Sequence, residues 1–432
     1  MTNTSKQCKA HPCCKRDVFS KGYCRLHISS KFGHIPLTAD QFDELLVKEI
    51  EDAEKDANGQ YNLYWHGLDF PVDHILFNSV NYENVRDRLS DCWINLQDSN
   101  IQHIFIATYN IRKLILSDAT IHGNTTIGVT DIGEISMVKT NLLGKFHCAS
   151  RLRKFDALGA TFNSEFYFAS TVYDLARFNG SGFYGSCHFH SADGFLFGKE
   201  ADDSFRVVGF DNVIFSRPTQ TLFDNVDLRK ASFKAVSLVG VRFINTNFYQ
   251  EEFGRNGIYN EITLLQKSSV NEKNALQRKR ELIHEYRQLR MAMENVKDYS
   301  KAHDFYIGEM EARQRREWSF MLWLYGKSSF YGTSYTKAFI WMLLLLVIHI
   351  TITASLTPDF RFTKLFVGYD TLECWGKFAD ILIHSFSIGT LQRIGLLSNV
   401  SNWQTIADIA FRVLFPIQTA MFVLALRNKT KR

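Results

Sequence analysis

The sequence lacks the short motifs of the common enzyme classes. It contains no Walker A phosphate loop, no HExxH zinc-protease motif, no GxSxG nucleophile elbow and no dinucleotide-binding fingerprint. His188 and His190, in the middle of the chain, are interpreted as surface residues rather than metal ligands. The sequence therefore favours a protein that is not an enzyme.

A large excess of charge of one sign is missing too. The formal net charge is +5 over 432 residues, which argues against a nucleic-acid-binding surface. Proline is scarce, at 6 residues, whereas phenylalanine is common, at 36. No apolar segment follows Met1, so we expect no cleavable signal peptide. In a cytoplasmic chain we expect the 8 cysteines to be metal ligands or inert thiols rather than disulfides.

Charge is absent altogether from one apolar run near the end of the chain. Residues 338–356 contain no Asp, Glu, Lys or Arg. A helix of this length, at about 1.5 Å per residue, crosses a hydrocarbon core of about 30 Å. A second apolar run covers residues 403–426, and a shorter one, 378–395, lies between the two. Irregular backbone at membrane depth survives only inside protein or beside a water-filled cavity, so two spans around a half-span predict a pore.

The second apolar run is unusually polar for a membrane span. It contains Asp408, Arg412, Pro416 and Gln418. A charge at the bilayer centre costs about 3 kcal/mol or more, so such residues usually face a bundle interior or an aqueous path. Asp408 and Arg412 are spaced i, i+4 and can pair on one helix face, and Pro416 allows a kink. The alternative is an amphipathic helix that packs on a soluble domain.

Basic residues flank the outer ends of the two spans. They are Arg315, Arg316, Lys327 and Lys337 before the first span, and Arg427, Lys429, Lys431 and Arg432 after the second. Charges balance in the segment between the spans, so the positive-inside rule predicts that both termini are cytoplasmic. Aromatic residues between Trp318 and Tyr335 predict a short helix at the membrane surface.

Four of the cysteines fall within the first 24 residues. Cys8, Cys14, Cys24 and His27 would make a closed Cys3His zinc site, in which Cys13 can replace Cys14. Such a small module would be held folded by its metal. The stretch resembles small zinc-binding modules of bacterial and phage proteins that end in a GxCxxH-type loop. The alternative is a disordered tail with free thiols.

The centre of the chain has a period of five residues. The cleanest run of large apolar residues is Phe223, Leu228, Phe233, Leu238, Phe243 and Phe248. Earlier members are Ile101, Ile106, Ile111, Leu116 and Ile121 and, after slips in phase, Phe162, Tyr167 and Val172. Small or β-branched residues often precede them by two positions, as do Ala231, Val236, Val241 and Thr246. Neither a helix nor a flat strand has this period, so we predict a repeat fold with Phe233 and Phe243 pointing inward.

This pattern resembles the pentapeptide-repeat family over residues 68–253, with interruptions near 194–203 and 216–221. The resemblance implies a right-handed, four-sided β-helix with one pentapeptide per face and rungs about 4.8 Å apart. Some members mimic DNA with an acidic surface, but acidic and basic residues nearly balance here, and we expect no binding to duplex DNA. Two basic clusters could hold a nucleotide or oligonucleotide, or could simply be a solvated face; they are Arg151, Arg153 and Lys154, and Arg229, Lys230 and Lys234.

A charged region of helical pattern follows at residues 261–316. Leu276, Leu282, Ile283, Tyr286, Leu289 and Met293 recur at helical spacing, and a break at Lys297–Asp298 precedes a second helix. The two predict an αα-hairpin. Residues 286–316 and the final LFPIQTAMFVLALRNK resemble bacterial pentapeptide-repeat proteins that end in a two-helix ion-channel domain. Potassium-channel relatives place four subunits around one pore, so the resemblance implies a homotetramer.

The segment between the spans departs from the potassium-channel pattern. In place of a TVGYG-type filter it reads SIGTLQRIG, with candidate pore residues Ser387, Gly389, Thr390, Gln392, Arg393 and Gly395. Potassium selectivity is therefore in doubt. Arg393 either forms a positive ring that favours anions or pairs with Glu373 or Asp380 and holds the loop.

Together these predictions give one architecture. It comprises a zinc-binding module (1–34), a cap or linker (35–67), a pentapeptide β-helix (68–255), a helical connector (256–317) and a membrane domain (318–432), with spans at 336–357 and 403–427 and a re-entrant segment at 375–395. We expect a homotetrameric ion channel of the bacterial inner membrane, gated through its cytoplasmic β-helix by a ligand or partner. The combination resembles membrane effectors of bacterial antiphage systems, including some controlled by nucleotide or oligonucleotide signals. The alternative is a membrane-anchored scaffold that binds a protein partner without conducting ions.

Overall fold

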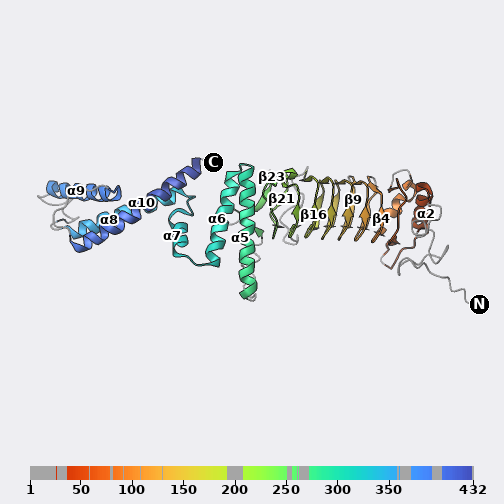
Figure 1. The fold of residues 1–432 in the computed structure, drawn as a ribbon, viewed down its shortest axis with the longest axis horizontal. Coiled ribbons are helices and arrows are strands. Elements are labelled where there is room, and N and C mark those ends of the chain that lie inside the picture. The colour runs from red at the N-terminus through yellow and green to blue at the C-terminus, as the bar shows by residue number, and fades with distance from the viewer. Residues whose placement is uncertain are drawn as a thin grey trace, which may run out of the picture. The chain divides into compact units, whose positions relative to one another are not determined.

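The computed structural model describes most of the chain. The described residues are 26, 37–57, 59–77, 81–90, 92–107, 109–128, 130–191, 208–250, 255–259, 261, 272–357, 360, 371–391 and 401–430. The chain forms two compact units, Met1–Glu309 and Met310–Arg432. Their helices and strands are labelled in Figure 1.

The first unit is built around a β-solenoid, whose strands stack in parallel ladders (Figure 1). One eight-stranded sheet contains β1 (Tyr61–Tyr64), β3 (Cys92–Asn95), β6 (Ile111–Ile115), β9 (Asp131–Ser136), β12 (Arg151–Asp156), β15 (Thr171–Arg177), β18 (Val208–Gly209) and β22 (Ala231–Ser232). A second contains β2 (Ile75–Leu76), β5 (His103–Ile106), β8 (Thr125–Ile127), β11 (Phe146–Cys148), β14 (Phe166–Phe168), β17 (Cys187–His190), β20 (Thr221–Asp224) and β23 (Arg242–Ile244).

Two shorter sheets complete the solenoid. The six-stranded sheet contains β4 (Asn100–Ile101), β7 (Thr120–Ile121), β10 (Asn141–Leu142), β13 (Thr161–Phe162), β16 (Gly182–Phe183) and β19 (Ile214–Phe215). The three-stranded sheet contains β21 (Asp227–Leu228), β24 (Asn247–Gln250) and β25 (Asn256–Gly257), and its β24–β25 pair is antiparallel.

The strand register explains the five-residue period. Arg151 pairs with Thr171 on the next rung, 171 − 151 = 20 residues later, and His147 pairs with Tyr167 at the same interval. A rung of 20 residues holds four five-residue units, so every fifth residue returns to an equivalent place. The register jumps between β17 and β20, where His188 pairs with Leu222, 222 − 188 = 34 residues later. That jump includes both interruptions predicted from the sequence.

The solenoid interior is filled mainly by aromatic and aliphatic side chains. Phe233 and Phe243 are 2% and 4% exposed, as predicted, and the small residues that precede them are also buried. The prediction for Tyr167 is wrong: its flanking residues Phe166 and Phe168 are fully buried, whereas Tyr167 points outward from β14. Strand alternation requires this, because neighbouring side chains leave opposite faces of a strand.

One glycine motif in the solenoid looks like a nucleotide-binding signature without being one. Residues 180–185 spell GxGxxG, but they surround β16 and lead into another strand, β17. A dinucleotide-binding turn leads into a helix whose N-terminus faces the pyrophosphate. These glycines therefore serve the tight packing of rungs.

Helices cover both ends of the solenoid (Figure 1). At the N-terminal end lies α2 (Ala39–Asp52), which buries Phe42, Leu46 and Ile50; η1 (Glu83–Val85) and α3 (Arg86–Leu89) follow. At the other end, the Glu285 carboxylate of α5 (Glu272–Asn295) accepts a hydrogen bond from the Phe233 N–H at 2.8 Å, and Gln288 accepts one from the Leu238 N–H at 3.1 Å. These side chains satisfy edge N–H groups that would otherwise be open to pairing with another chain.

The predicted αα-hairpin is present. Lys297, in the left-handed region at φ 62°, separates α5 from α6 (Tyr299–Arg316). Glu309 of α6 is fully buried and lies 3.1 Å from Arg287 and 3.0 Å from Arg290, both on α5. Five of the six predicted apolar positions of α5 are buried, but Leu276 is 49% exposed, so that prediction is wrong.

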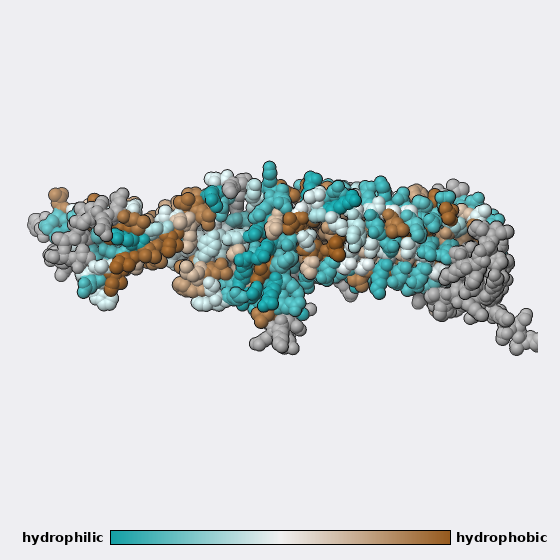
Figure 2. All heavy atoms as spheres, in the orientation of Figure 1, coloured by the Kyte–Doolittle hydropathy of each residue, from teal (hydrophilic) through white to brown (hydrophobic). Residues whose placement is uncertain are grey.

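The second unit is helical. It contains α7 (Phe320–Ser329), α8 (Tyr335–Leu356), α9 (Thr371–Gly389) and α10 (Asn402–Thr430). By length and composition α8 and α10 are able to cross a membrane, and apolar surface runs along them in Figure 2. Only 17% of the most apolar window of each helix is buried, whereas the core helix of a soluble protein would be mostly buried. This disfavours the soluble alternative for α10.

Candidate functional site

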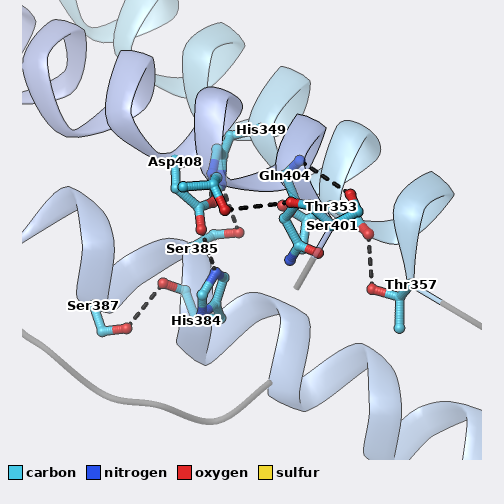
Figure 3. Close-up of polar contacts among 10 residues, drawn as sticks. His349, Thr353, Thr357, His384, Ser385, Ser387, Ser401, Gln404 and Asp408 are labelled. Atoms are coloured by element: carbon cyan, nitrogen blue, oxygen red, sulfur yellow. Dashed lines mark hydrogen bonds and ion pairs between the residues drawn. The ribbon is translucent and has the colours of Figure 1, made fainter. Parts of the chain in front are cut away.

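A buried polar cluster joins the three long helices of the second unit (Figure 3). Asp408 of α10 accepts hydrogen bonds on both carboxylate oxygens, from His349 Nε2 of α8 at 2.9 Å and from His384 Nε2 of α9 at 3.2 Å. His349 is 3% exposed and His384 is 6% exposed. One residue from each helix therefore meets at a single point, which we call the His–Asp–His cluster.

Further contacts fix the orientation of His349. Its Nδ1 lies 2.9 Å from Ser385 Oγ, and its ring stacks on Phe411 with centroids 4.1 Å apart. An imidazole that donates from Nε2 to a carboxylate has, in its neutral form, only Nδ1 left as an acceptor. Ser385 therefore donates to His349 in that state. The ring is held by polar contacts at both nitrogens and by an aromatic face.

The polar surface extends one helical turn beyond the cluster. Thr353 follows His349 by four residues on α8, and Gln404 precedes Asp408 by four on α10 (Figure 3). Thr353 Oγ1, Gln404 Nε2 and His384 Nδ1 are all buried and find no hydrogen-bond partner within the described part of the chain. Buried polar atoms of this kind call for water, an ion or another chain as a partner.

The polar residues of the second apolar run fall on different faces of α10. Asp408 does not pair with Arg412, so that sequence-based prediction is wrong: its partners are histidines on two other helices. Gln418 also faces inward and donates to the Ala338 carbonyl of α8 at 2.8 Å. Arg412 is exposed, and no ion pair involves it among the described residues.

At about 100° per residue, α10 divides into three faces. The face packed inside the unit holds Gln404, Asp408, Phe411, Gln418 and Ala425. An exposed face is entirely apolar and holds Ile406, Val413, Ile417 and Leu414. The remaining face, here the Arg412 face, holds mostly small or polar residues: Thr405, Arg412, Pro416, Thr419 and Val423.

The Arg412 face continues into an open groove of about 670 Å³. Gly389, Thr390 and Leu391, at the C-terminal end of α9, form one side, and α10 supplies the other through residues that include Pro416, Thr419 and Val423. Two predicted pore residues, Gly389 and Thr390, therefore lie beside the Arg412 face. Ser387 lies one turn earlier on α9 and donates to the His384 carbonyl at 2.9 Å.

Several predicted site residues lie outside the described part of the chain. Gln392, Arg393 and Gly395 of the pore segment are among them, as are the proposed zinc ligands Cys8, Cys14, Cys24 and His27. The four described cysteines are Cys92, Cys148, Cys187 and Cys374, and all are buried. Burial raises the pKa of Cys148 to about 11 and also raises that of Cys187, so both are inert thiols at neutral pH.

Most of the charge in the two basic clusters is already paired. Arg151 lies 2.8 Å from Asp131, Arg153 lies 2.5 Å from Asp174, and Arg229 binds Asp227. Both clusters border strands of one sheet, β12 and β22, with β15 and β18 between them. A phosphate ligand would have to compete with these carboxylates, which favours the solvated-face alternative. Anion binding there stays a prediction, for Lys154, Lys230 and Lys234 as for the arginines.

Sequence reasoning missed His349 and His384 as functional residues. The signal was available: each is the one histidine of its helix, and Asp408 is the one acidic residue of α10. Single titratable residues in three successive apolar segments favour a meeting point inside the bundle.

Comparisons with protein-family models, with curated proteins and with solved structures return no match. The β-solenoid and the two candidate membrane helices are accordingly established by the geometry of this chain alone, and its function has to be argued from the same geometry.

Proposed function

We propose that this protein is an ion channel in which the Arg412 face of α10 lines an aqueous pore made by several copies of the chain. The observation that carries the proposal is the position of Arg412. It is exposed and lies near residue 415, the midpoint of the candidate span Asn402–Asn428. An arginine at the centre of a membrane helix costs about 2.5–3.5 kcal/mol against lipid, so it faces water or protein.

The division of α10 into faces supports the same conclusion. Its apolar face suits lipid, its buried face packs inside the unit, and the Arg412 face is left for other copies of the chain or for a pore. A helix that only anchors a scaffold needs no third, polar face. The homotetramer remains part of the proposal and rests on the resemblance to two-helix channels.

The helix α9 supports a re-entrant arrangement. Its first half carries Glu373, Lys377 and Asp380, and only Ile381–Gly389 is free of charge. Those 9 residues extend about 14 Å, half of a hydrocarbon core. If α8 and α10 cross and α9 enters only halfway, both termini lie on one side, and the basic flanks favour the cytoplasmic side.

The remaining parts of the proposal concern the cytoplasmic region. We take the β-solenoid to be a right-handed, four-sided pentapeptide helix that receives the gating signal, in a bacterial inner-membrane protein that acts in antiphage defence. The five-residue period and the resemblance described above support this assignment. The alternative function is a membrane-anchored scaffold that binds a protein partner.

Cysteine accessibility in proteoliposomes tests the orientation of α10. We expect Thr419→Cys, on the Arg412 face, to react with a charged, membrane-impermeant maleimide, because the position borders water. Ile417→Cys, two residues away on the apolar face, is the matched control and should stay unlabelled. Peptide mapping by mass spectrometry separates these sites from the native cysteines. Equal labelling of both, or labelling of Ile417→Cys alone, would contradict the proposed pore face.

A further inference from the structure

Three side chains on the outer surface of the solenoid are arranged as a metal site. His188 and His190 lie on β17, where Cys187 and Phe189 point inward, so strand alternation sends both histidines outward on one face. Asp224 lies on the neighbouring strand β20, in register with His190. The ring centroids of the two histidines are 5.8 Å apart, and His190 Nδ1 lies 3.2 Å from Asp224 Oδ2.

The donor atoms are close enough to share one ion. One ligand atom from each of the three residues can be chosen so that all lie within 4.8 Å of one another. In a tetrahedral zinc site with bonds of about 2.0–2.2 Å, ligand atoms stand roughly 3.4 Å apart. Small side-chain rotations would close this difference, since the backbone already holds the residues on adjacent strands.

His188 in particular has an unused nitrogen. Its Nε2 is shielded from solvent and finds no hydrogen-bond partner within the described part of the chain. The ring packs edge-to-face on Tyr167, with centroids 5.2 Å apart, and Tyr167 packs in the same way on His147 at 4.6 Å. The aromatic ladder holds His188 in place, and a shielded nitrogen without a partner favours a ligand over an ordinary surface histidine.

We propose that His188, His190 and Asp224 bind a divalent transition-metal ion of the zinc class, with at least one coordination position left for water. Two imidazoles and a carboxylate suit zinc and its neighbours, whereas magnesium and calcium prefer oxygen ligands alone. The site lies on the repeat domain and is independent of the proposed pore. It also corrects the sequence-based interpretation of His188 and His190 as plain surface residues.

The location suggests what the ion does. His190 and Asp224 are 34 residues apart in sequence, because the chain leaves the regular repeat between β17 and β20. An ion bound to both strands closes this excursion and fastens two rungs where the regular register is interrupted. Ligands that bind only the folded state stabilise it, so metal binding should raise the stability of this part of the solenoid.

Zinc titration of the full-length protein in detergent tests the site. The background is Cys24→Ser, which removes the expected N-terminal site, and bound metal is first stripped with a chelator. We expect one equivalent of zinc to bind, and His188→Ala or Asp224→Asn to weaken that binding at least 10- to 100-fold. His147→Ala is the matched control, a histidine on the same outer surface two rungs away, and should bind zinc like the background protein.

Hydrogen exchange of the β17 and β20 amides provides the second readout. Zinc should slow their exchange in the background protein and leave it unchanged in Asp224→Asn, a variant of nearly the same shape. If both ligand variants bind zinc with the background affinity, or if the background protein binds none, the site does not exist. Neither outcome bears on ion conduction, so this test and that of the channel are separate.

Discussion

Replacing Phe166 with alanine should destabilise the solenoid by about 3–5 kcal/mol, the usual cost of removing a fully buried aromatic side chain. Phe166 has no exposed surface and lies at the centre of a group of rings. It stacks on Phe146 at 5.1 Å and meets Phe162 and Phe183 edge-on at 4.6 and 4.8 Å. The cavity would open on several rungs at once, so neighbouring side chains can fill little of it.

Tyr167→Ala is the control for this prediction. The two residues are adjacent on β14, and the five-residue period alone would place Tyr167 inside. The structure predicts the opposite, so Tyr167→Ala should cost well under half as much as Phe166→Ala. Hydrogen exchange of the β11, β14 and β17 amides gives the local free energy of opening for both variants. A larger loss for Tyr167→Ala would show that the orientation of β14 is wrong.

Asp408→Ala is expected to have a comparable effect on the second unit. It leaves two buried imidazole N–H groups, on His349 and His384, without an acceptor. Breaking a buried charge-assisted network by removing one partner typically costs about 3–5 kcal/mol. Because the three residues come from α8, α9 and α10, the loss should appear as separation of these helices. Thermal unfolding in detergent measures it.

A double-mutant cycle identifies the partner of Asp408. With His349→Ala already present, Asp408→Ala should cost much less than it does alone, because the two residues share one hydrogen bond. With Arg412→Ala present, the cost of Asp408→Ala should be unchanged. Strong coupling to Arg412 and none to His349 would restore the i, i+4 pair that the sequence suggested.

The periodicity of the sequence predicted the solenoid well because each rung repeats the same geometry. Phe223 to Phe248 keep a strict five-residue spacing, and every one of these residues is buried. Prediction failed at Tyr167 because three aromatic residues, Phe166, Tyr167 and Phe168, are consecutive there. A period of five fits any one of them, and only the strand's alternation decides which two point inward.

The polar cluster was harder to predict than the fold. Residue spacing reveals partners on the same helix, which is why Arg412 was the natural candidate for Asp408. The actual partners are 59 and 24 residues away in sequence, and their contact depends on how α8, α9 and α10 pack. The metal site has the same origin, since Asp224 reaches His190 only through the register of β17 and β20.

Single-channel recording tests the central claim most directly. The purified full-length protein, reconstituted in a planar bilayer, should give discrete current steps, because the Arg412 face lines a continuous aqueous path. Arg412→Glu should shift the reversal potential in a salt gradient toward cation preference, since a ring of positive charge becomes negative. Intact oligomers that insert into the bilayer and pass no current under any condition, including after opening of the cytoplasmic domain by mild proteolysis, would contradict the account and favour the scaffold.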